Sequence, residues 1–134
     1  MANVFLQTAS EQPPASSEAA AFIRQGEYWH LAFDGQVVML RDGKGMHYLA
    51  ALLRRAGQRV PVTELAPGSA AVHEPDDHAV LERTRSAVTK RIRDALQRIE
   101  KNHSALGRHL GGQVKTGYEC MYAPDPDQPV IWQL

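Results

Sequence analysis

Apolar and polar positions alternate in the first well-patterned stretch of the chain, residues 22–40. Aromatic and β-branched side chains are frequent there, and the dipeptide Asp34-Gly35 divides the stretch into two runs. An Asp-Gly pair between apolar runs is typical of a two-residue hairpin turn. The pattern predicts strands at about residues 28–33 and 36–40, in which Trp29 and Phe33 pack into a core together with Trp132 from the last residues.

The apolar residues then recur every three or four positions, which predicts helices. Met46, Leu49 and Leu53 share one face of a first helix expected over about residues 44–56, with Gly57 at its C′ position. Thr63 has a side chain that can cap a second, brief helix over residues 64–66. Proline, glycine and acidic residues predict a loop over residues 67–77.

The longest helix is predicted over about residues 78–102, with an aspartate just before it as its cap. Ser104 begins a further short turn, which is expected to be interrupted at Gly107, Gly111 and Gly112. A β-hairpin follows over residues 111–122, then a polar turn over residues 124–129 and a last strand over residues 130–134.

Composition divides the chain into a tail and one domain. Residues 8–21 are rich in Ser, Ala, Glu and Pro, so we expect a flexible tail over residues 1–21 and a single folded domain over residues 22–134. The first residues lack a basic n-region and a long apolar h-region, so we do not expect a signal peptide, and no apolar run reaches membrane-spanning length. A cytoplasmic protein with no membrane partner is expected, and the single cysteine excludes an internal disulfide.

Charge is balanced in total but uneven along the chain. The 15 basic and 15 acidic residues cancel, which argues against nucleic-acid binding. Residues 83–115, however, hold nine basic and two acidic side chains, a local charge of +7 that leaves −7 on the remainder. The molecule is therefore predicted to be electrostatically polarised.

The longest predicted helix has two distinct faces. Its apolar face is formed by Leu81, Val88, Ile92, Ala95, Leu96 and Ile99. The opposite face mixes long cations with short hydrogen-bonding side chains. A charged helix face is often only a solvated face, but this mixture suits the major groove of DNA, where such side chains meet base edges and phosphates.

Two sets of candidate DNA contacts follow from the helical wheel. The residues expected to face bases are Ser86, Thr89, Lys90, Arg93 and Gln97. The residues expected to contact phosphates are Arg83, Arg85, Arg91, Arg98 and Lys101.

Residues 83–96, RTRSAVTKRIRDAL, and residues 114–122, VKTGYECMY, resemble parts of a known family. The winged-helix DNA-binding domain of OmpR/PhoB-type response regulators has a helix of the type R-T-x-x-x-x-x-x-R-L-R-x-x-L, followed by a hairpin turn R-G-x-G-Y. The matching residues here are Arg83, Thr84, Arg91, Ile92, Arg93, Leu96, Lys115, Gly117 and Tyr118. With the similar upstream residues, the resemblance covers about residues 37–122.

This resemblance implies an α+β fold of the winged-helix type, with N-terminal β-strands, a three-helix helix-turn-helix core and a C-terminal hairpin wing. It implies double-stranded DNA as the partner, with the wing residues Lys115, Thr116 and Tyr118 beside the backbone and the Tyr118 ring partly buried. RNA polymerase or another regulator is a further expected partner of the loop at residues 67–77. A homodimer on repeated half-sites is also expected.

From Phe22 onward the sequence also resembles an uncharacterised module attached to larger bacterial regulators and ATPases, through landmarks such as EYW, AVTKRIR and LGRHL. Two departures from the OmpR/PhoB pattern limit the comparison. The first 21 residues have no room for a receiver domain, so control by phosphorylation is not implied. Residues 102–110 lengthen the link to the wing and are expected to displace it.

Enzyme chemistry has little support in the sequence. Residues 73–78, HEPDDH, contain metal-ligand types but in no established zinc spacing. Cys120 has no base and orienting group near it in sequence, and residues 42–45, DGKG, lack the spacing of a phosphate-binding loop. We expect no catalytic residue, metal or cofactor, and His103 and His109 are expected to be solvated or to cap a helix.

The sequence therefore predicts a bacterial DNA-binding protein, either a transcriptional regulator or an accessory factor, which would be associated with the nucleoid. The alternative is a protein-interaction or oligomerisation module that keeps the scaffold without binding DNA, since a fold does not fix a function.

Overall fold

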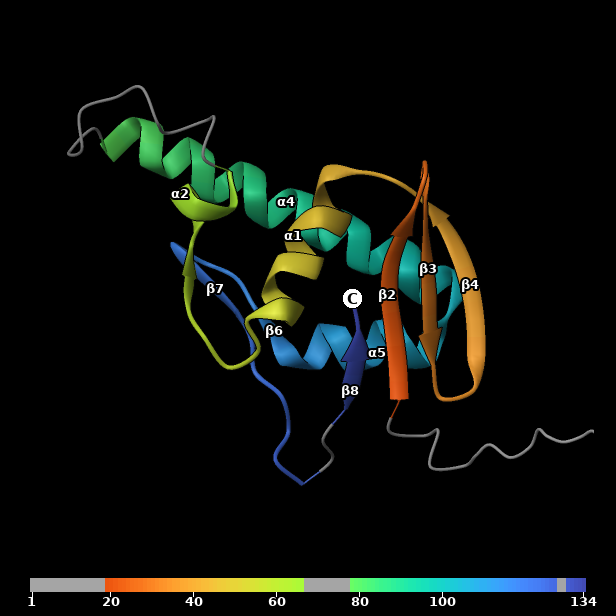
Figure 1. Cartoon of the computed structure of the whole chain (residues 1–134). Helices are drawn as coiled ribbons and strands as arrows, with labels where there is room; N and C mark the ends of the chain where they lie inside the picture. Colours follow the sequence, from red (N-terminus) through yellow and green to blue (C-terminus); the bar gives the residue numbers. More distant parts are fainter. Residues whose placement is uncertain (1–18, 67–77, 128–129) are drawn as a thin grey trace, which may run out of the picture.

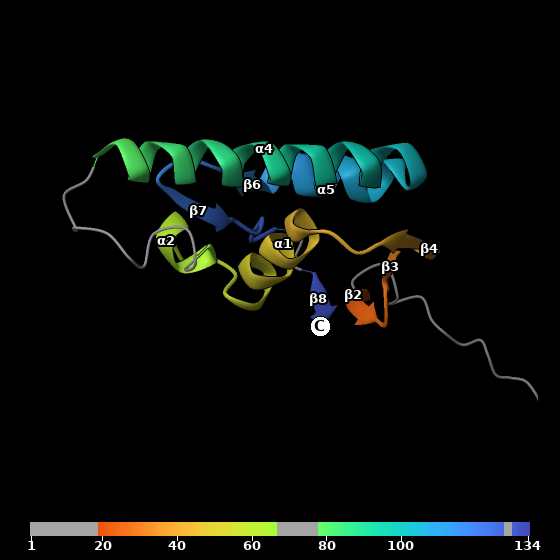
Figure 2. The ribbon, with the colours of Figure 1, turned by 90° about the horizontal axis from the view of Figure 1, so that it is seen from above.

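The computed structural model describes residues 19–66, 78–127 and 130–134. The fold is α+β, with helices packed on one face of an N-terminal sheet and a small second sheet at the other end (Figures 1 and 2). No helix in these ranges combines the length and the apolar character needed to cross a membrane.

The N-terminal sheet has four strands in the order β4-β3-β2-β8. Its strands are β2 (Ala19–Gln25), β3 (Tyr28–Phe33), β4 (Gln36–Arg41) and β8 (Ile131–Gln133). β2, β3 and β4 pair antiparallel, whereas β8 runs parallel to β2. Because β2 begins at Ala19, the last three residues predicted as tail belong to the sheet, and the rest of that predicted tail lies outside the described residues.

The predicted hairpin between β3 and β4 is confirmed. Asp34 and Gly35 have φ values of 52° and 81°, the left-handed conformations that a two-residue turn between twisted strands requires. The inward face of the sheet buries Phe22, Leu31 and Leu40, as the alternation of the strands requires.

The first helix, α1 (Lys44–Arg54), ends two residues before its predicted end. Its C-cap is Arg55, so Gly57 lies one position beyond C′. β5 (Val60–Pro61) leads into α2 (Val62–Leu65). The prediction that Thr63 caps this helix is wrong, because Pro61 occupies the N-cap position and Thr63 lies inside the turn of helix.

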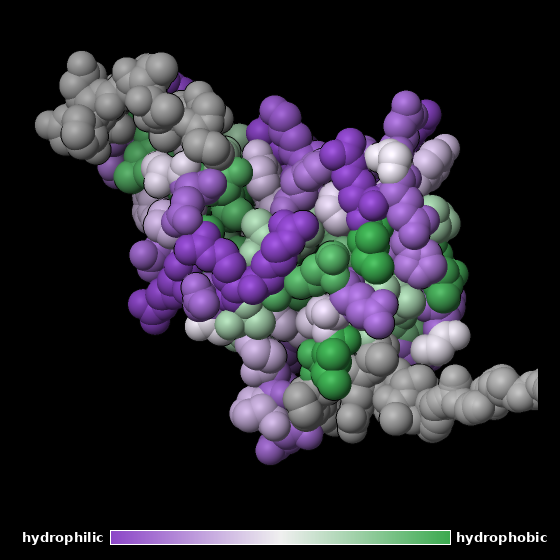
Figure 3. Space-filling model, viewed as in Figure 1, coloured by the Kyte–Doolittle hydropathy of each residue, from purple (hydrophilic) through white to green (hydrophobic). Residues whose placement is uncertain are grey.

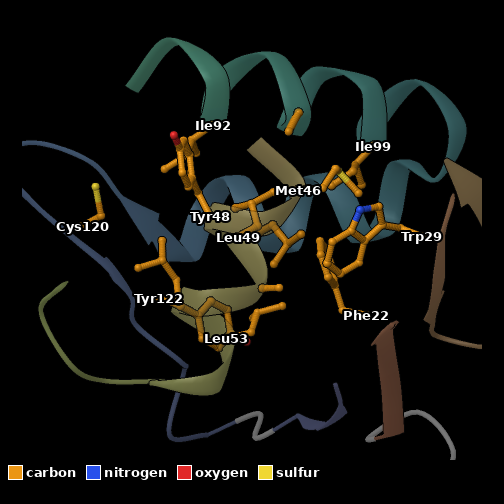
Figure 4. Close-up of a cluster of buried hydrophobic side chains, with 14 of the residues drawn as sticks. Phe22, Trp29, Met46, Tyr48, Leu49, Leu53, Ile92, Ile99, Cys120 and Tyr122 are labelled. Carbon is orange, nitrogen blue, oxygen red and sulfur yellow. The ribbon is translucent and has the colours of Figure 1, made fainter. Parts of the chain in front are cut away.

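The long helix α4 (His78–Asn102) has the predicted bounds. The structure buries Val88, Ile92, Ala95 and Ile99 and half-buries Leu81 and Leu96, which confirms the predicted apolar face. Thr84 is also buried, and its hydroxyl donates to the Val80 carbonyl at 3.0 Å. In Figure 4, Met46 of α1 reaches towards Ile99 of α4, and Phe22 and Trp29 close the cluster from the sheet.

The predicted break after Ser104 is wrong. Residues Ser104–Gln113 form one helix, α5, which returns along α4 and contains all three glycines. Gly107 explains how the two helices come so close: a Cβ at this position would lie 2.5 Å from the Glu100 Cα. Its missing side chain is required for packing and does not signal a turn.

His103 links the corner between α4 and α5 to the hairpin. Its side chain is 1% exposed. Nδ1 accepts from the Leu106 N–H at 3.2 Å, so the proton is on Nε2, which donates to the Phe33 carbonyl at 2.9 Å and the Gln36 carbonyl at 3.1 Å. His103 therefore caps α5, which confirms one of its two expected roles. The other expectation, a solvated side chain, is wrong, because His103 is buried.

The second sheet has the order β5-β7-β6, with β6 (Val114–Lys115) and β7 (Glu119–Tyr122) forming the predicted C-terminal hairpin. β5 pairs antiparallel with β7, with Val60 opposite Cys120. Residues 111–113, which the sequence pattern assigned to the hairpin, belong to α5 instead.

His109 lies in an aromatic cluster that holds β8 in place. The imidazole Nε2 is 2.7 Å from the Tyr122 hydroxyl, which also accepts from the Trp132 indole N–H at 3.3 Å. Phe33 stacks on Trp132 at a centroid distance of 6.2 Å. Trp29 is buried in the core and Phe33 and Trp132 are partly buried against it, which agrees with the core or sheet-packing positions predicted for them. His109 is half-buried in this cluster and does not cap a helix.

Stability is expected to fall as the pH drops below about 6.5 because of His109. Burial lowers the pKa of this imidazole from its ordinary 6.5, and the weaker opposing effect comes from the Asp125 carboxylate. The unfolded chain therefore binds this proton more tightly than the folded protein does. The contribution of His109 to stability is full above pH 6.5 and is lost as the pH falls from 6.5 towards the lower pKa of the folded state. The urea midpoint should fall more between about pH 7.5 and 5.5 in the wild type than in His109→Gln. Equal losses in the two proteins would contradict this expectation.

Candidate nucleic-acid interface

One face of α4 is open to solvent along the back of the molecule. α1, α2 and α5 pack against its other sides, and in Figure 2 α4 forms the upper margin of the described chain. The amphipathic sequence explains this placement, because the apolar residues face α1 and α5 and the polar residues are left outside.

The predicted base-facing residues all lie on this open side. Ser86, Lys90, Arg93 and Gln97 are exposed, and Thr89 is half-buried. A shallow hollow of about 420 Å³ is lined by these five residues together with Arg85 and Asp94. The Thr89 hydroxyl oxygen is shielded from solvent and has no hydrogen-bond partner within the described ranges, so in this rotamer it is not presented to a base.

The cationic side chains on α4 differ in whether they form ion pairs or hydrogen bonds with other described residues. Arg83, Arg91, Arg93 and Lys101 are exposed, and within the described residues none of them has an ion pair or a side-chain hydrogen bond. The Lys90 ammonium instead lies 3.1 Å from the Asp94 carboxylate. At 76% and 58% side-chain exposure this pair is weak, so a phosphate competes with Asp94 at little cost.

Two predicted phosphate contacts have partners within the protein. Arg98 donates from Nη2 to the Arg41 carbonyl at 2.9 Å and so connects α4 to the end of β4. Arg85 donates to the Glu82 carboxylate, and its guanidinium carbon lies 5.6 Å from the centre of the Tyr118 ring. Both arginines therefore position structural elements instead of standing free for DNA.

Tyr118 connects the hairpin to the first half of α4. Its hydroxyl donates to the Glu82 carboxylate, and the hydrogen bonds from Arg85 and then Tyr118 lower the Glu82 pKa to about 2. The same bond to Glu82 raises the pKa of Tyr118. Tyr118 is 44% exposed, more than the partly buried ring expected from sequence.

The other two wing residues differ in exposure: Lys115 is exposed, and Thr116 is half-buried. A hollow of about 510 Å³ on the outward side of the second sheet is lined by Lys115 and by Arg59, which the sequence pattern did not single out. Arg59 carries no periodic signal. Only its position directly before β5, two strands away from Lys115, brings it to this face.

Cys120 is buried on β7, and burial raises the pKa of its thiol. A thiol in that state is a poor nucleophile at neutral pH. Within the described residues, no three His, Cys, Asp or Glu side chains gather closely enough to hold a metal ion. His73 to Asp77 of the HEPDDH segment lie outside those residues, as does the predicted polymerase-contacting loop.

Comparison of the chain with family models, with curated proteins and with solved structures found no match.

Proposed function

We propose that this chain binds double-stranded DNA, on a scaffold of the winged-helix type, with the open face of α4 in the major groove. The observation that carries the proposal is the set of free cations beside short polar side chains on that face: Arg83, Arg93 and Lys101 with Ser86 and Gln97. Cations of this kind neutralise phosphates, while Gln and Arg can read base edges.

The arrangement of the second sheet supports the winged-helix scaffold. β5 separates the first two helices and pairs with the hairpin that follows the last helix, so that the small sheet lies beside α1 and α2, and both of these helices pack on α4. α5 is an addition to that plan. It turns the chain back along α4 (Figure 1). The hydrogen bond from the Tyr118 hydroxyl to the Glu82 carboxylate then holds the wing against α4.

The role of each α4 cation follows from its contacts. Arg93 lies in the hollow with Ser86 and Gln97, so it is the best candidate for a guanine contact, and Arg83 and Lys101 at either end suit phosphates. Burial raises the pKa of the Cys120 thiol and so makes it a poor nucleophile, which supports binding over catalysis at this residue.

Replacing both Arg83 and Arg93 by Glu is expected to weaken binding of random duplex DNA and to reduce the salt dependence of binding. Removing the Arg83 phosphate contact should lower the slope of log K against log salt by about one, and removing the Arg93 base contact should weaken binding further. Fluorescence anisotropy of labelled duplex between about 50 and 200 mM salt measures both quantities. Arg54→Glu is the matched control, because Arg54 is an exposed arginine on α1, away from the open face of α4.

A protein-interaction module on the same scaffold is the alternative, favoured by the zero net charge of the chain and the internal pairing of Lys90. It replaces the DNA proposal if random duplex gives no anisotropy change at low salt. The protein-interaction alternative also replaces the DNA proposal if the Arg83 and Arg93 double variant binds duplex DNA as tightly as Arg54→Glu does. Selection from a random DNA pool then shows whether any binding is sequence-specific.

A further inference from the structure

β4 is an open edge of the N-terminal sheet. In the order β4-β3-β2-β8 it has no neighbour on its outer side among the described residues, and it lies at the right-hand margin of Figures 1 and 2. The strand has six residues, whereas the opposite edge strand, β8, has three. β4 is therefore the longer of the two places at which another strand can join this sheet.

The hydrogen-bonding groups that point outward from this edge can be identified from the register. Phe33 pairs with Gln36 across the two-residue turn, and inward and outward groups then alternate along β4. Two contacts agree with this alternation: the Asp42 N–H turns inward to the Glu27 carbonyl at 2.9 Å, and the Arg41 carbonyl turns outward to Arg98.

Val37 and Met39 therefore direct their backbone groups away from the sheet. In the described part of the chain, no hydrogen bond reaches the outward N–H and C=O of either residue. Their side chains are also exposed, at 55% for Val37 and 47% for Met39. Figure 3 shows apolar side chains at the right-hand margin, where β4 lies.

The edge also lacks the features that normally prevent pairing. Natural edge strands are protected by lysine, proline, bulges or inward-pointing charges. β4 reads QVVMLR and pairs with β3 without interruption, so its only charge is Arg41 at one end. An edge of this kind is suited to receiving a strand.

We propose that β4 pairs antiparallel with β4 of a second copy of this chain, forming a continuous sheet across a two-fold axis. With Val37 opposite Met39 of the second copy, each copy supplies the outward groups that the other lacks. Val37 and Met39 of the two copies then form one apolar strip across the join.

Charge favours a second copy as the occupant. In this register Gly35 lies opposite Arg41 of the second copy, and Asp34 lies opposite Asp42, whose carboxylate is already paired with Arg24 and His47. The exposed Asp34 carboxylate then has the Arg41 guanidinium as its unpaired neighbour of opposite charge, once on each side of the axis. Asp34 has no ion pair among the described residues. The edge is thus complementary to itself at its ends as well as at its centre.

The pairing does not depend on the proposed function, but it has a consequence for that function. The two-fold axis stands perpendicular to the joined sheet, and the helices cover one face of that sheet (Figure 2). Both copies of α4 therefore lie on the same side, as contact with one DNA duplex by two half-sites requires.

Met39→Pro tests the pairing, because it removes an outward N–H that has no partner in the single chain. Proline is tolerated on edge strands for this reason. The control is Met39→Thr, which removes the same apolar side chain but keeps the N–H and a β-branched shape. Molar mass is measured by sedimentation and light scattering on the whole chain without DNA, with circular dichroism to check that each protein is folded.

The wild type is expected to be a dimer at about 100 μM. Met39→Pro removes one intermolecular hydrogen bond from each copy, so the dissociation constant of the dimer should rise about thirtyfold. Met39→Thr should remain dimeric. If Met39→Pro does not fold, Val37→Lys, which places a protective lysine on the edge, must give a monomer.

Three results would overturn the proposal: a wild-type monomer at about 500 μM, a Met39→Pro protein that dimerises like the wild type, or a Met39→Thr protein as monomeric as Met39→Pro. Failure of the DNA proposal is separate. The Arg83 and Arg93 double variant should lose DNA binding while its mass without DNA remains that of the wild type.

Discussion

Gly107→Ala is expected to lower the free energy of unfolding by about 3 kcal/mol, since overpacking of a tight contact costs 1–3 kcal/mol and backbone atoms yield less than side chains. The added methyl would lie 2.5 Å from both Cα and Cβ of Glu100, so α5 must move away from α4 to admit it. Chemical denaturation in urea, followed by tryptophan fluorescence, measures the change.

Gly111→Ala is the control in the same helix, because a Cβ there has no atom within 4 Å. Alanine is a better helix former than glycine by about 1 kcal/mol, so this variant should be slightly more stable than the wild type. Equal destabilisation by the two substitutions would show that α5 is sensitive to any change, and the close approach of α4 and α5 would not be the reason.

His103→Ala is expected to destabilise the fold by about 3 kcal/mol. The substitution leaves a cavity, removes the cap of α5 and takes away the N–H that joins the Phe33 and Gln36 carbonyls. The loss is measured by urea unfolding at neutral pH.

His103→Asn separates the two roles of the imidazole. Asparagine is a good N-cap, so it should restore about 1 kcal/mol of the loss while leaving the hairpin carbonyls without their donor. His78→Ala, at the exposed start of α4, should change stability by less than about 0.5 kcal/mol. A loss from His103→Ala no larger than that from His78→Ala would mean that the hairpin is held by its own turn.

Local patterns predicted the elements whose causes are local. The Asp34-Gly35 turn, the face of α1 and the full extent of α4 follow from residue spacing, and the structure agrees with each. α5 was missed because glycine reads as a breaker when only its neighbours in sequence are considered. The reason for Gly107 is Glu100 on the preceding helix, and no periodic signal within α5 reports that contact. β2 as a whole was not predicted as a strand, and the small residues at its start, Ala19 to Ala21, resemble a tail until a partner strand pairs with them.

The candidate interface likewise has features that the sequence predicted and features that it could not predict. Its open face was visible in the sequence, because amphipathicity places Ser86, Arg93 and Gln97 away from the core. The internal partners of Arg85 and Arg98 were not visible. Arg98 binds a carbonyl 57 positions earlier in the chain, and Arg85 lies against the wing residue Tyr118. A helical wheel cannot separate such engaged cations from free ones.

β8 makes the completion of the sheet depend on the order of synthesis. Ala19 and Ile131 are paired neighbours, yet they stand at opposite ends of the described sequence. During translation β2 can pair with β3 early, but its other edge has no partner until residues 131–133 have left the ribosome. Trp132 then enters the space beside Phe33 and Tyr122, so the aromatic cluster closes only after the other elements of the described chain have been made.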